Sequence, residues 1–210
     1  NLCFWLAENN YSNILKIHRD SAEEDIKKNI EDADFIIHLA GVNRPKNNSD
    51  FDKGNAVFTD NIVQLLLDLK KKTPIIFASS TQAEDISPYG LSKLKAENIV
   101  KKYGALSGAK YYIYRLPNVF GKWCKPNYNS FIATFCHNIS RNIPIEVHDP
   151  SAEISLVYID DVCNSFLSTI EDSSESGYLY IDKAYKSSVG KVANLLTKFK
   201  DSRLSLVTED

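Results

Sequence analysis

The fold is decided by residues 74–103, which read PIIFASSTQAEDISPYGLSKLKAENIVKKY. The stretch opens with an apolar run that ends in three hydroxyl residues at 79–81. Such a run, bounded by a proline and by hydroxyls, is typical of a buried parallel strand. The second half predicts a helix, because Ser87 can cap it, Pro88 suits its first position and Gly104 suits its end. We therefore expect a strand, a loop and a helix in this order.

Tyr89 and Lys93 are four residues apart, so both side chains lie on one face of the predicted helix. The unperturbed pKa of a phenol is about 10. A neighbouring ammonium and the positive end of the helix dipole favour phenolate, so we expect a lowered pKa for Tyr89. Together with a strand-end hydroxyl, this pattern predicts a general acid/base. Taken alone, Tyr-x-x-x-Lys is more often an aromatic–cation pair on a solvated helix face.

Composition excludes several classes of function. The 210 residues carry a net charge of −2 with both signs mixed, which indicates no nucleic-acid surface. The four cysteines form no C-x-x-C pair and the histidines show no metal-ligand spacing, so we expect a cytoplasmic protein with reduced thiols and no metal. No apolar run reaches membrane-spanning length, and no signal peptide is present. His38, inside an apolar strand, is predicted to be a satisfied core histidine.

Helical and strand patterns alternate along the first part of the chain. We expect strands at 14–18, 35–41, 75–78 and 111–116, and helices at 2–6, 21–30, 55–72 and 88–103. Ser21 and Glu24 form a capping-box pattern for the second of these helices. This alternation predicts an α/β fold, a Rossmann-like doubly wound parallel sheet covered on both faces.

The pattern changes beyond residue 117. Residues 117–129 are too polar and too rich in proline for regular structure. The later pattern predicts helices at 130–141, from 160, and at 189–199, with strands at 145–147, 155–158 and 178–181. We divide the chain into a dinucleotide-binding part, 1–117, and a part, 118–210, that is mainly a small substrate-binding lobe. This lobe is expected to close over the carboxyl ends of the strands, where ligands of such folds bind.

The hydroxyl-ended strand followed by YGLSK at 89–93 resembles the extended short-chain dehydrogenase/reductase superfamily, the NAD-dependent epimerases and dehydratases. Three further runs stand in the family's order: FIIHLAG at 35–41, RLPNVFG at 115–121 and YIDDV at 158–162. The resemblance implies a catalytic set of Ser80, Tyr89 and Lys93. It also implies cofactor contacts from Arg19, Leu39, Ala40, Gly41, Ser79, Tyr89, Lys93 and Pro117.

Two longer runs, LAGVNRP at 39–45 and GKWCKPNYNS at 121–130, resemble the amino-terminal reductase domain of the bifunctional enzymes that make UDP-N-acetyl-L-fucosamine. This likeness implies an NADPH-dependent reduction of a UDP-4-keto-6-deoxy sugar for capsular polysaccharide, with a cupin-type domain following. The resemblance implies a UDP-sugar contact from Asn118. Lys122, Trp123, Lys125 and Asn127 suit a nucleotide diphosphate and uracil, although packing at a lobe interface would also explain them. Arg19 suits the 2′-phosphate of NADPH and makes NADH the less favoured cofactor, although a solvent-facing arginine explains it equally well. A homodimer is left open.

The superfamily's glycine-rich loop has no counterpart here, because the eight glycines include no G-x-x-G-x-x-G spacing. We expect the first strand and its loop to precede Asn1, so that this chain alone binds cofactor poorly and is inactive. Two alternatives stand. One is an epimerase or dehydratase of the same superfamily, although residues 81–83 separate the strand-end hydroxyls from Glu84 and count against a dehydratase. The other is a catalytically silent Rossmann-like binding module.

Overall fold

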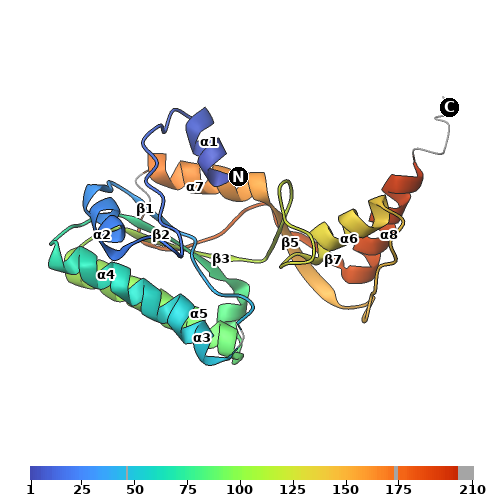
Figure 1. The fold of residues 1–210 in the computed structure, drawn as a ribbon, viewed down its shortest axis with the longest axis horizontal. Coiled ribbons are helices and arrows are strands. Elements are labelled where there is room, and N and C mark those ends of the chain that lie inside the picture. The colour runs from blue at the N-terminus through green and yellow to red at the C-terminus, as the bar shows by residue number, and fades with distance from the viewer. Residues whose placement is uncertain (46, 173–174, 203–210) are drawn as a thin grey trace. The chain divides into compact units, whose positions relative to one another are not determined.

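The computed structural model describes residues 1–45, 47–172 and 175–202. These residues form two compact units. The larger unit comprises Leu2–Leu116 and Cys163–Ile181, and the smaller comprises Asn1, Pro117–Val162 and residues 182–202. Figure 1 labels their helices and strands. None of the helices in the described ranges is long and apolar enough to cross a bilayer.

A four-stranded sheet forms the centre of the larger unit. Its strands are β1 (Ile36–His38), β2 (Ile75–Ser80), β3 (Tyr111–Leu116) and β6 (Gly177–Leu179), in that spatial order. Every neighbouring pair is parallel, and β2 pairs with β3 along its whole length. Parallel neighbours need crossover connections, and helices supply them here.

Helices cover both faces of this sheet (Figure 1). One face carries α2 (Glu23–Asp32), α4 (Phe58–Asp68) and α5 (Pro88–Ser107); the other carries α1 (Leu2–Glu8) and the part of α7 (Ile159–Glu171) that belongs to this unit. The core between sheet, α4 and α5 includes the fully buried Leu66, Phe77, Val100 and Tyr103. On the opposite face, the ring of Tyr114 packs 4.9 Å from that of Phe166 on α7. The predicted doubly wound, Rossmann-like α/β sheet is therefore confirmed.

The stretch from β2 to α5 folds largely as its sequence predicts. The Ser80 hydroxyl accepts a hydrogen bond from the Gln82 amide and starts a short 3-10 helix, η2 (Thr81–Glu84). Ser87 caps α5 by accepting from the Gly90 amide at 3.0 Å. The predicted end of α5 at Gly104 is wrong, since the helix continues to Ser107 and is capped by Gly108, whose φ of +73° suits glycine. Gly104 has another role: a Cβ there would come 2.4 Å from the Tyr111 ring.

The helix expected at 55–72 begins earlier. α3 (Ser49–Phe51) leads into a π-helical segment, η1 (Asp52–Val57), and then into α4. A π-helical turn inside a longer helix changes which side chains face inward, and such turns are frequent at functional sites. The buried residues of η1 are Asn55, which is 1 % exposed, and Ala56.

Three local predictions for these parts of the chain are wrong. Residues 14–18 form no strand, because no described segment pairs with them in a ladder. Ser21 does not cap α2; its hydroxyl accepts from the His18 amide instead, and the helix begins two residues later, at Glu23. Residues 145–147 likewise lie outside the strands of the described chain.

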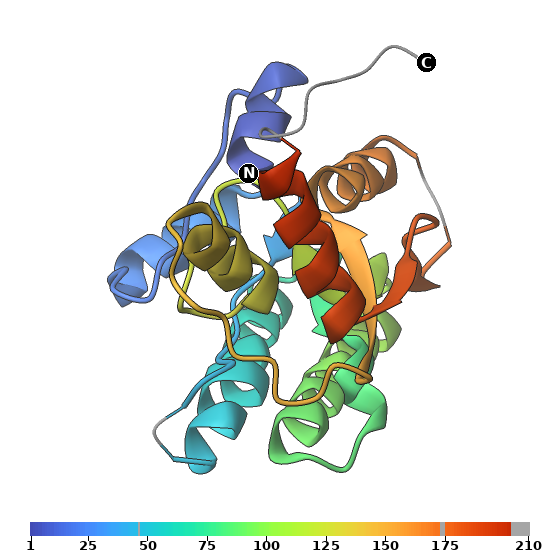
Figure 2. The same ribbon diagram turned by 90° about the vertical axis from the view of Figure 1, so that its right-hand side faces the viewer.

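The smaller unit has a mixed sheet of three strands, β4 (Asn118–Phe120), β5 (Glu153–Tyr158) and β7 (Tyr185–Ser188). β4 is parallel to β5 and β7 is antiparallel to it. The helices α6 (Phe131–Ser140) and α8 (Val189–Asp201) lie side by side (Figure 2). Both β4 and β7 went unpredicted, because each is only three or four residues long, too short to show a period. β4 contradicts the expectation that residues 117–129 lack regular structure.

Candidate active site

The catalytic candidates of the larger unit lie where β2 ends and α5 begins. Ser80 is the last residue of β2 and Tyr89 lies in the first turn of α5, close enough for the Ser80 hydroxyl to act on the pKa of the phenol. One helical turn further along α5, the Lys93 ammonium donates to the Ala78 carbonyl at 2.7 Å and lies 4.3 Å from the centre of the Phe77 ring. The helix thus presents a phenol and a cation to the carboxyl end of one central strand.

Tyr89 is half-buried, with its ring 5.6 Å from that of Phe51. Burial raises the pKa of the phenol, and the hydrogen bond with Ser80 only partly opposes this. The expected lowering is therefore wrong for the chain as it stands, because desolvation of a phenolate outweighs the attractions that favour it. A phenol with a raised pKa keeps its proton at neutral pH, which suits a proton donor.

Lys93 is a buried cation, only 3 % exposed. Burial lowers its pKa from 10.5 to about 8, while the charge of Glu97 works in the opposite direction. The side chain therefore remains mostly an ammonium at pH 7, close to the point at which it would lose its proton.

The turn after β1 lies against this centre. Leu39, Ala40 and Gly41 are exposed, and a Cβ on Gly41 would come 2.9 Å from the Asn55 Oδ1 and 3.8 Å from the Lys93 Nζ. Only a residue without a side chain leaves that space open.

Asn55 holds the turn in place. Its Oδ1 accepts from the Val42 amide at 2.8 Å, and its Nδ2 donates to the Val42 carbonyl at 3.2 Å and to the Ser92 hydroxyl at 2.8 Å. Ser92 in turn donates to the Tyr89 carbonyl at 2.7 Å. The π-helical segment, the turn and α5 are thus joined by a single buried amide, which the sequence reading passed over as the start of an ordinary helix.

A second group missed from the sequence is the buried pair of Glu97 and Arg115. The Arg115 guanidinium binds both carboxylate oxygens, at 3.0 and 2.7 Å, and Ser79 donates to the same carboxylate at 2.5 Å. These contacts lower the pKa of Glu97 against the opposing effect of burial. The signal was available, because Tyr89, Lys93 and Glu97 continue one helix face at intervals of four.

His38 is the core histidine that the sequence predicted, 3 % exposed and 2.8 Å from the Thr59 hydroxyl. The Thr59 hydroxyl donates its own proton to the Asn55 carbonyl at 2.6 Å, so the Nε2 of His38 is the donor to Thr59. Burial, with a smaller contribution from Lys93, lowers the pKa of His38 to about 3. The ring is therefore neutral at pH 7.

The remaining predicted residues fall in several places. Ser79 is buried and bonded to Glu97, and Arg19 is exposed in the turn after residue 18. The other predicted contacts belong to the smaller unit, where all but the partly buried Pro117 are exposed: Asn118, Lys122, Trp123, Lys125 and Asn127. Two of these, Trp123 and Asn127, adopt positive φ angles of 62° and 55°.

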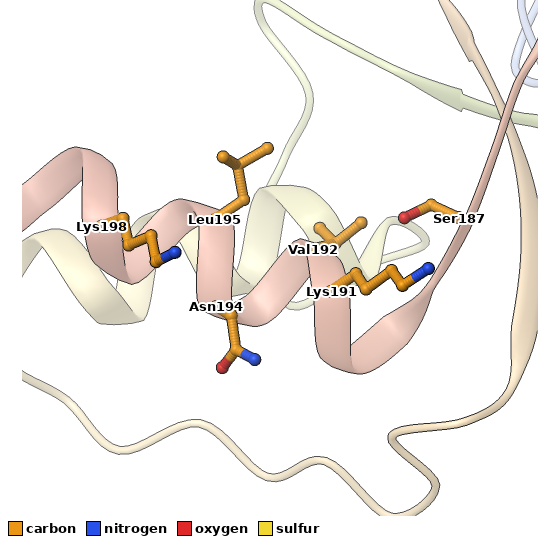
Figure 3. Close-up of a pocket in the computed structure, with 6 residues that line it drawn as sticks. All are labelled: Ser187, Lys191, Val192, Asn194, Leu195 and Lys198. Atoms are coloured by element: carbon orange, nitrogen blue, oxygen red, sulfur yellow. The ribbon is translucent and has the colours of Figure 1, made fainter.

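The smaller unit also carries a hollow on one side of α8 (Figure 3), lined by Ser187, Lys191, Val192, Asn194, Leu195 and Lys198. Its lining includes cations and hydroxyl or amide groups but no acid, so it offers no acid/base pair. Within the described residues, no cluster of three or more histidines, cysteines or acids could hold a metal ion.

Comparison with known proteins assigns the family. Residues 8–180 match the NAD dependent epimerase/dehydratase family. The chain belongs to this family. The predicted resemblance is thus confirmed, and so is the expectation of a family that uses a nicotinamide cofactor.

Two relatives are similar over nearly the whole chain. The UDP-2-acetamido-2,6-beta-L-arabino-hexul-4-ose reductase of Pseudomonas aeruginosa is 44% identical over 99% of this chain and 56% of its own length. The crystal structure of the capsular polysaccharide assembling protein CapF of Staphylococcus aureus is 41% identical, with a TM-score of 0.86, over 97% of this chain and 55% of that one. The chain therefore spans about half the length of these relatives.

A third likeness concerns the fold alone. A UDP-glucose 4-epimerase of Thermotoga maritima, solved with UDP-glucose, has a TM-score of 0.79 at 20% identity, over 95% of this chain. One scaffold thus serves proteins that are named for different reactions, and the reaction must be argued from the site.

Proposed function

We propose that the chain is the reductase part of a cytoplasmic, NADPH-dependent enzyme that reduces a UDP-linked 4-keto-6-deoxy sugar for capsular polysaccharide synthesis. One observation carries the proposal. Ser80 at the end of β2 and Tyr89 at the start of α5 are followed, one helical turn along, by the buried Lys93 ammonium, in a chain that is 44% identical to a reductase named for such a sugar.

The site residues have distinct tasks in this reaction. A bound nicotinamide cofactor would supply hydride to the carbonyl carbon. Tyr89 donates its phenol proton to the carbonyl oxygen, since its raised pKa keeps it protonated. Ser80 holds that oxygen by a hydrogen bond, and the Lys93 ammonium stabilises the phenolate that remains.

The residues around Lys93 fit the nicotinamide end of such a cofactor. The exposed turn Leu39–Ala40–Gly41 leaves open the space beside the Lys93 ammonium, which a side chain at position 41 would fill. We place the nicotinamide and its ribose there. For the 2′-phosphate that distinguishes NADPH from NADH, we assign the exposed guanidinium of Arg19.

The UDP moiety is assigned to the smaller unit as a substrate-binding lobe. Its loop presents two exposed lysines, Lys122 and Lys125, and an exposed indole at Trp123, which suit a diphosphate and a pyrimidine ring. Asn118 and Asn127 add amide groups that can bind the sugar nucleotide. The left-handed backbone at Trp123 costs conformational energy, and residues held in this way cluster at ligand sites.

The test follows NADPH oxidation by the complete protein that carries this chain, with a UDP-4-keto-6-deoxy sugar as substrate. We expect oxidation, and a loss of about 10²-fold or more in the Tyr89→Phe variant. Tyr180→Phe is the matched control, because Tyr180 is 74 % exposed and outside the site. Interconversion of UDP-sugars without net loss of NADPH would instead identify an epimerase, and no reaction with any such sugar would favour a silent binding module.

A further inference from the structure

The third residue on the catalytic face of α5 is Glu97, four residues after Lys93 and 0 % exposed. Its carboxylate accepts hydrogen bonds from three strands of the larger unit. Ser79 on β2 donates at 2.5 Å, Arg115 on β3 donates to both oxygens, and Tyr178 on β6 donates at 2.8 Å. A carboxylate bound in this way is fixed in place and stays ionised.

We infer that Glu97 is a positioning residue of the active site, the buried negative charge that keeps Lys93 an ammonium. The inference rests on the proposed function, in which Lys93 must carry its proton. It assigns to the Glu97 cluster a role in the reaction beyond joining α5 to the sheet.

The surroundings of Lys93 leave Glu97 as its counter-charge. From β1, His38 faces it as a neutral ring, and from β2 it meets the Ala78 carbonyl and the Phe77 ring. Gly41 comes close to it without a side chain, and on α5 Tyr89 is a neutral phenol. Among the described residues that face it, therefore, Glu97 alone bears a negative charge.

Arg115 pairs with Glu97 and also with a second carboxylate. Its Nη1 donates to Glu84 at 2.8 Å, at the exposed end of the cluster. Lys93, Glu97, Arg115 and Glu84 therefore alternate in sign, with Glu97 innermost and Glu84 70 % exposed.

The same cluster fixes the end of β2. Ser79 directly precedes Ser80, and its hydroxyl proton goes to Glu97. Ser80 is the last residue of β2, so the buried carboxylate fixes the residue directly before it. Glu97 thus acts on two residues of the site: it accepts a hydrogen bond from Ser79, and its charge favours the protonated form of Lys93.

Glu97→Gln tests the charge while keeping the volume. We expect the Lys93 pKa to fall by about one unit or more, as expected for removal of a buried charge one helical turn away. Glu84→Gln is the matched control, since it removes the other carboxylate that pairs with Arg115, at an exposed position. It should leave the Lys93 pKa at about 8. The pKa is read from the Lys93 Cε resonance in a ¹³C NMR titration, assigned as the signal missing from Lys93→Met.

Reductase activity of the complete protein gives the second readout. In Glu97→Gln we expect the alkaline fall in kcat to move to lower pH by as much as the Lys93 pKa falls. Activity is then largely restored near pH 6 and lost near pH 8. Glu97→Asp keeps the charge and keeps the alkaline limb in place, which decides the matter even if the glutamine variant fails to fold. The inference is overturned if the Lys93 pKa is unchanged in Glu97→Gln, or if this variant loses activity equally at every pH. It is also overturned if the alkaline limb of Glu97→Asp shifts to lower pH as expected for Glu97→Gln. If the unaltered protein oxidises no NADPH, the proposed function fails, while the NMR titration still decides the role of Glu97.

Discussion

The polar residues around Lys93 in the larger unit are buried, whereas the predicted substrate contacts of the smaller unit are exposed. In the larger unit, His38, Asn55, Lys93 and Glu97 are each at most 3 % exposed, and each is bonded to partners from other elements. In the smaller unit, residues 122–125 are exposed, and Trp123 is 66 % exposed.

The difference separates two demands on an enzyme. Groups that transfer protons need pKa values set by burial and by fixed neighbours, so they are built into the core. Groups that bind a solvated, charged ligand must remain accessible to it, so they stay on the surface. Substitutions in the buried set should therefore change stability and chemistry together, whereas substitutions in the exposed loop should change binding alone.

The largest effect expected concerns His38 in acid. Because its folded pKa is about 3 and its ordinary value 6.5, the unfolded chain binds a proton first as the pH falls. The stability that His38 contributes is complete above pH 6.5 and falls by roughly 5 kcal/mol toward pH 3. Urea unfolding between pH 7 and 4 should show a shallower acid loss in His38→Gln than in the unaltered chain. The exposed His148→Gln should keep the original slope, and equal slopes for all three would contradict the buried assignment.

Lys93→Met should separate stability from activity. We expect reductase activity to fall by about 10³-fold, equivalent to about 4 kcal/mol, because the cation beside Tyr89 is gone. Stability at pH 7 should rise by about 1–3 kcal/mol, since burying the charged amine is costly. This gain should shrink as the pH rises from about 8 toward 10.5, where the folded lysine has lost its proton and the unfolded one has not. A less stable variant with full activity would show that Lys93 is only structural.

Asn55→Ala should cost about 1–3 kcal/mol of stability, because it leaves the Val42 backbone and Ser92 without their partner. The turn at 39–41 should then move more freely, and we expect the KM for NADPH to rise more than kcat falls. Thermal unfolding with steady-state kinetics measures both. Asn61→Ala, an exposed change on the following helix, is the control.

Trp123→Ala should have the smallest effect. Because the indole is exposed, we expect stability to change by less than about 0.5 kcal/mol and the KM for the UDP-sugar to rise about tenfold. The exposed Tyr185→Ala, in the same unit, should change neither quantity. An unchanged KM in Trp123→Ala would remove this residue from the substrate site.

The sequence predicted what depends on period and local chemistry. The apolar run of β2, the Ser87 cap and the Tyr89–Lys93 spacing each follow from neighbouring residues, and each has the predicted structure. These features suffice for the parallel order of the sheet and for the helix face that carries the site.

The features that were missed depend on distant partners. Asn55 bonds to a turn thirteen residues away, and Glu97 bonds to Arg115 and Tyr178 on other strands. The direction of the Tyr89 pKa likewise depends on how deeply the folded chain buries the ring. None of these can be weighed until tertiary packing is known.

The central claim is that Tyr89 and Lys93 serve a net reduction at C4 of a UDP-linked sugar. The most direct measurement supplies the complete protein with NADPH that carries deuterium at the transferable position of its nicotinamide ring, together with a UDP-4-keto-6-deoxy sugar, and locates the label by NMR. We expect one deuterium on C4 of the product, formed as NADPH is consumed, and formation of this product about 10²-fold slower or more in the Tyr89→Phe variant. A product without deuterium at C4, or sugar interconversion that leaves the labelled NADPH intact, would contradict it.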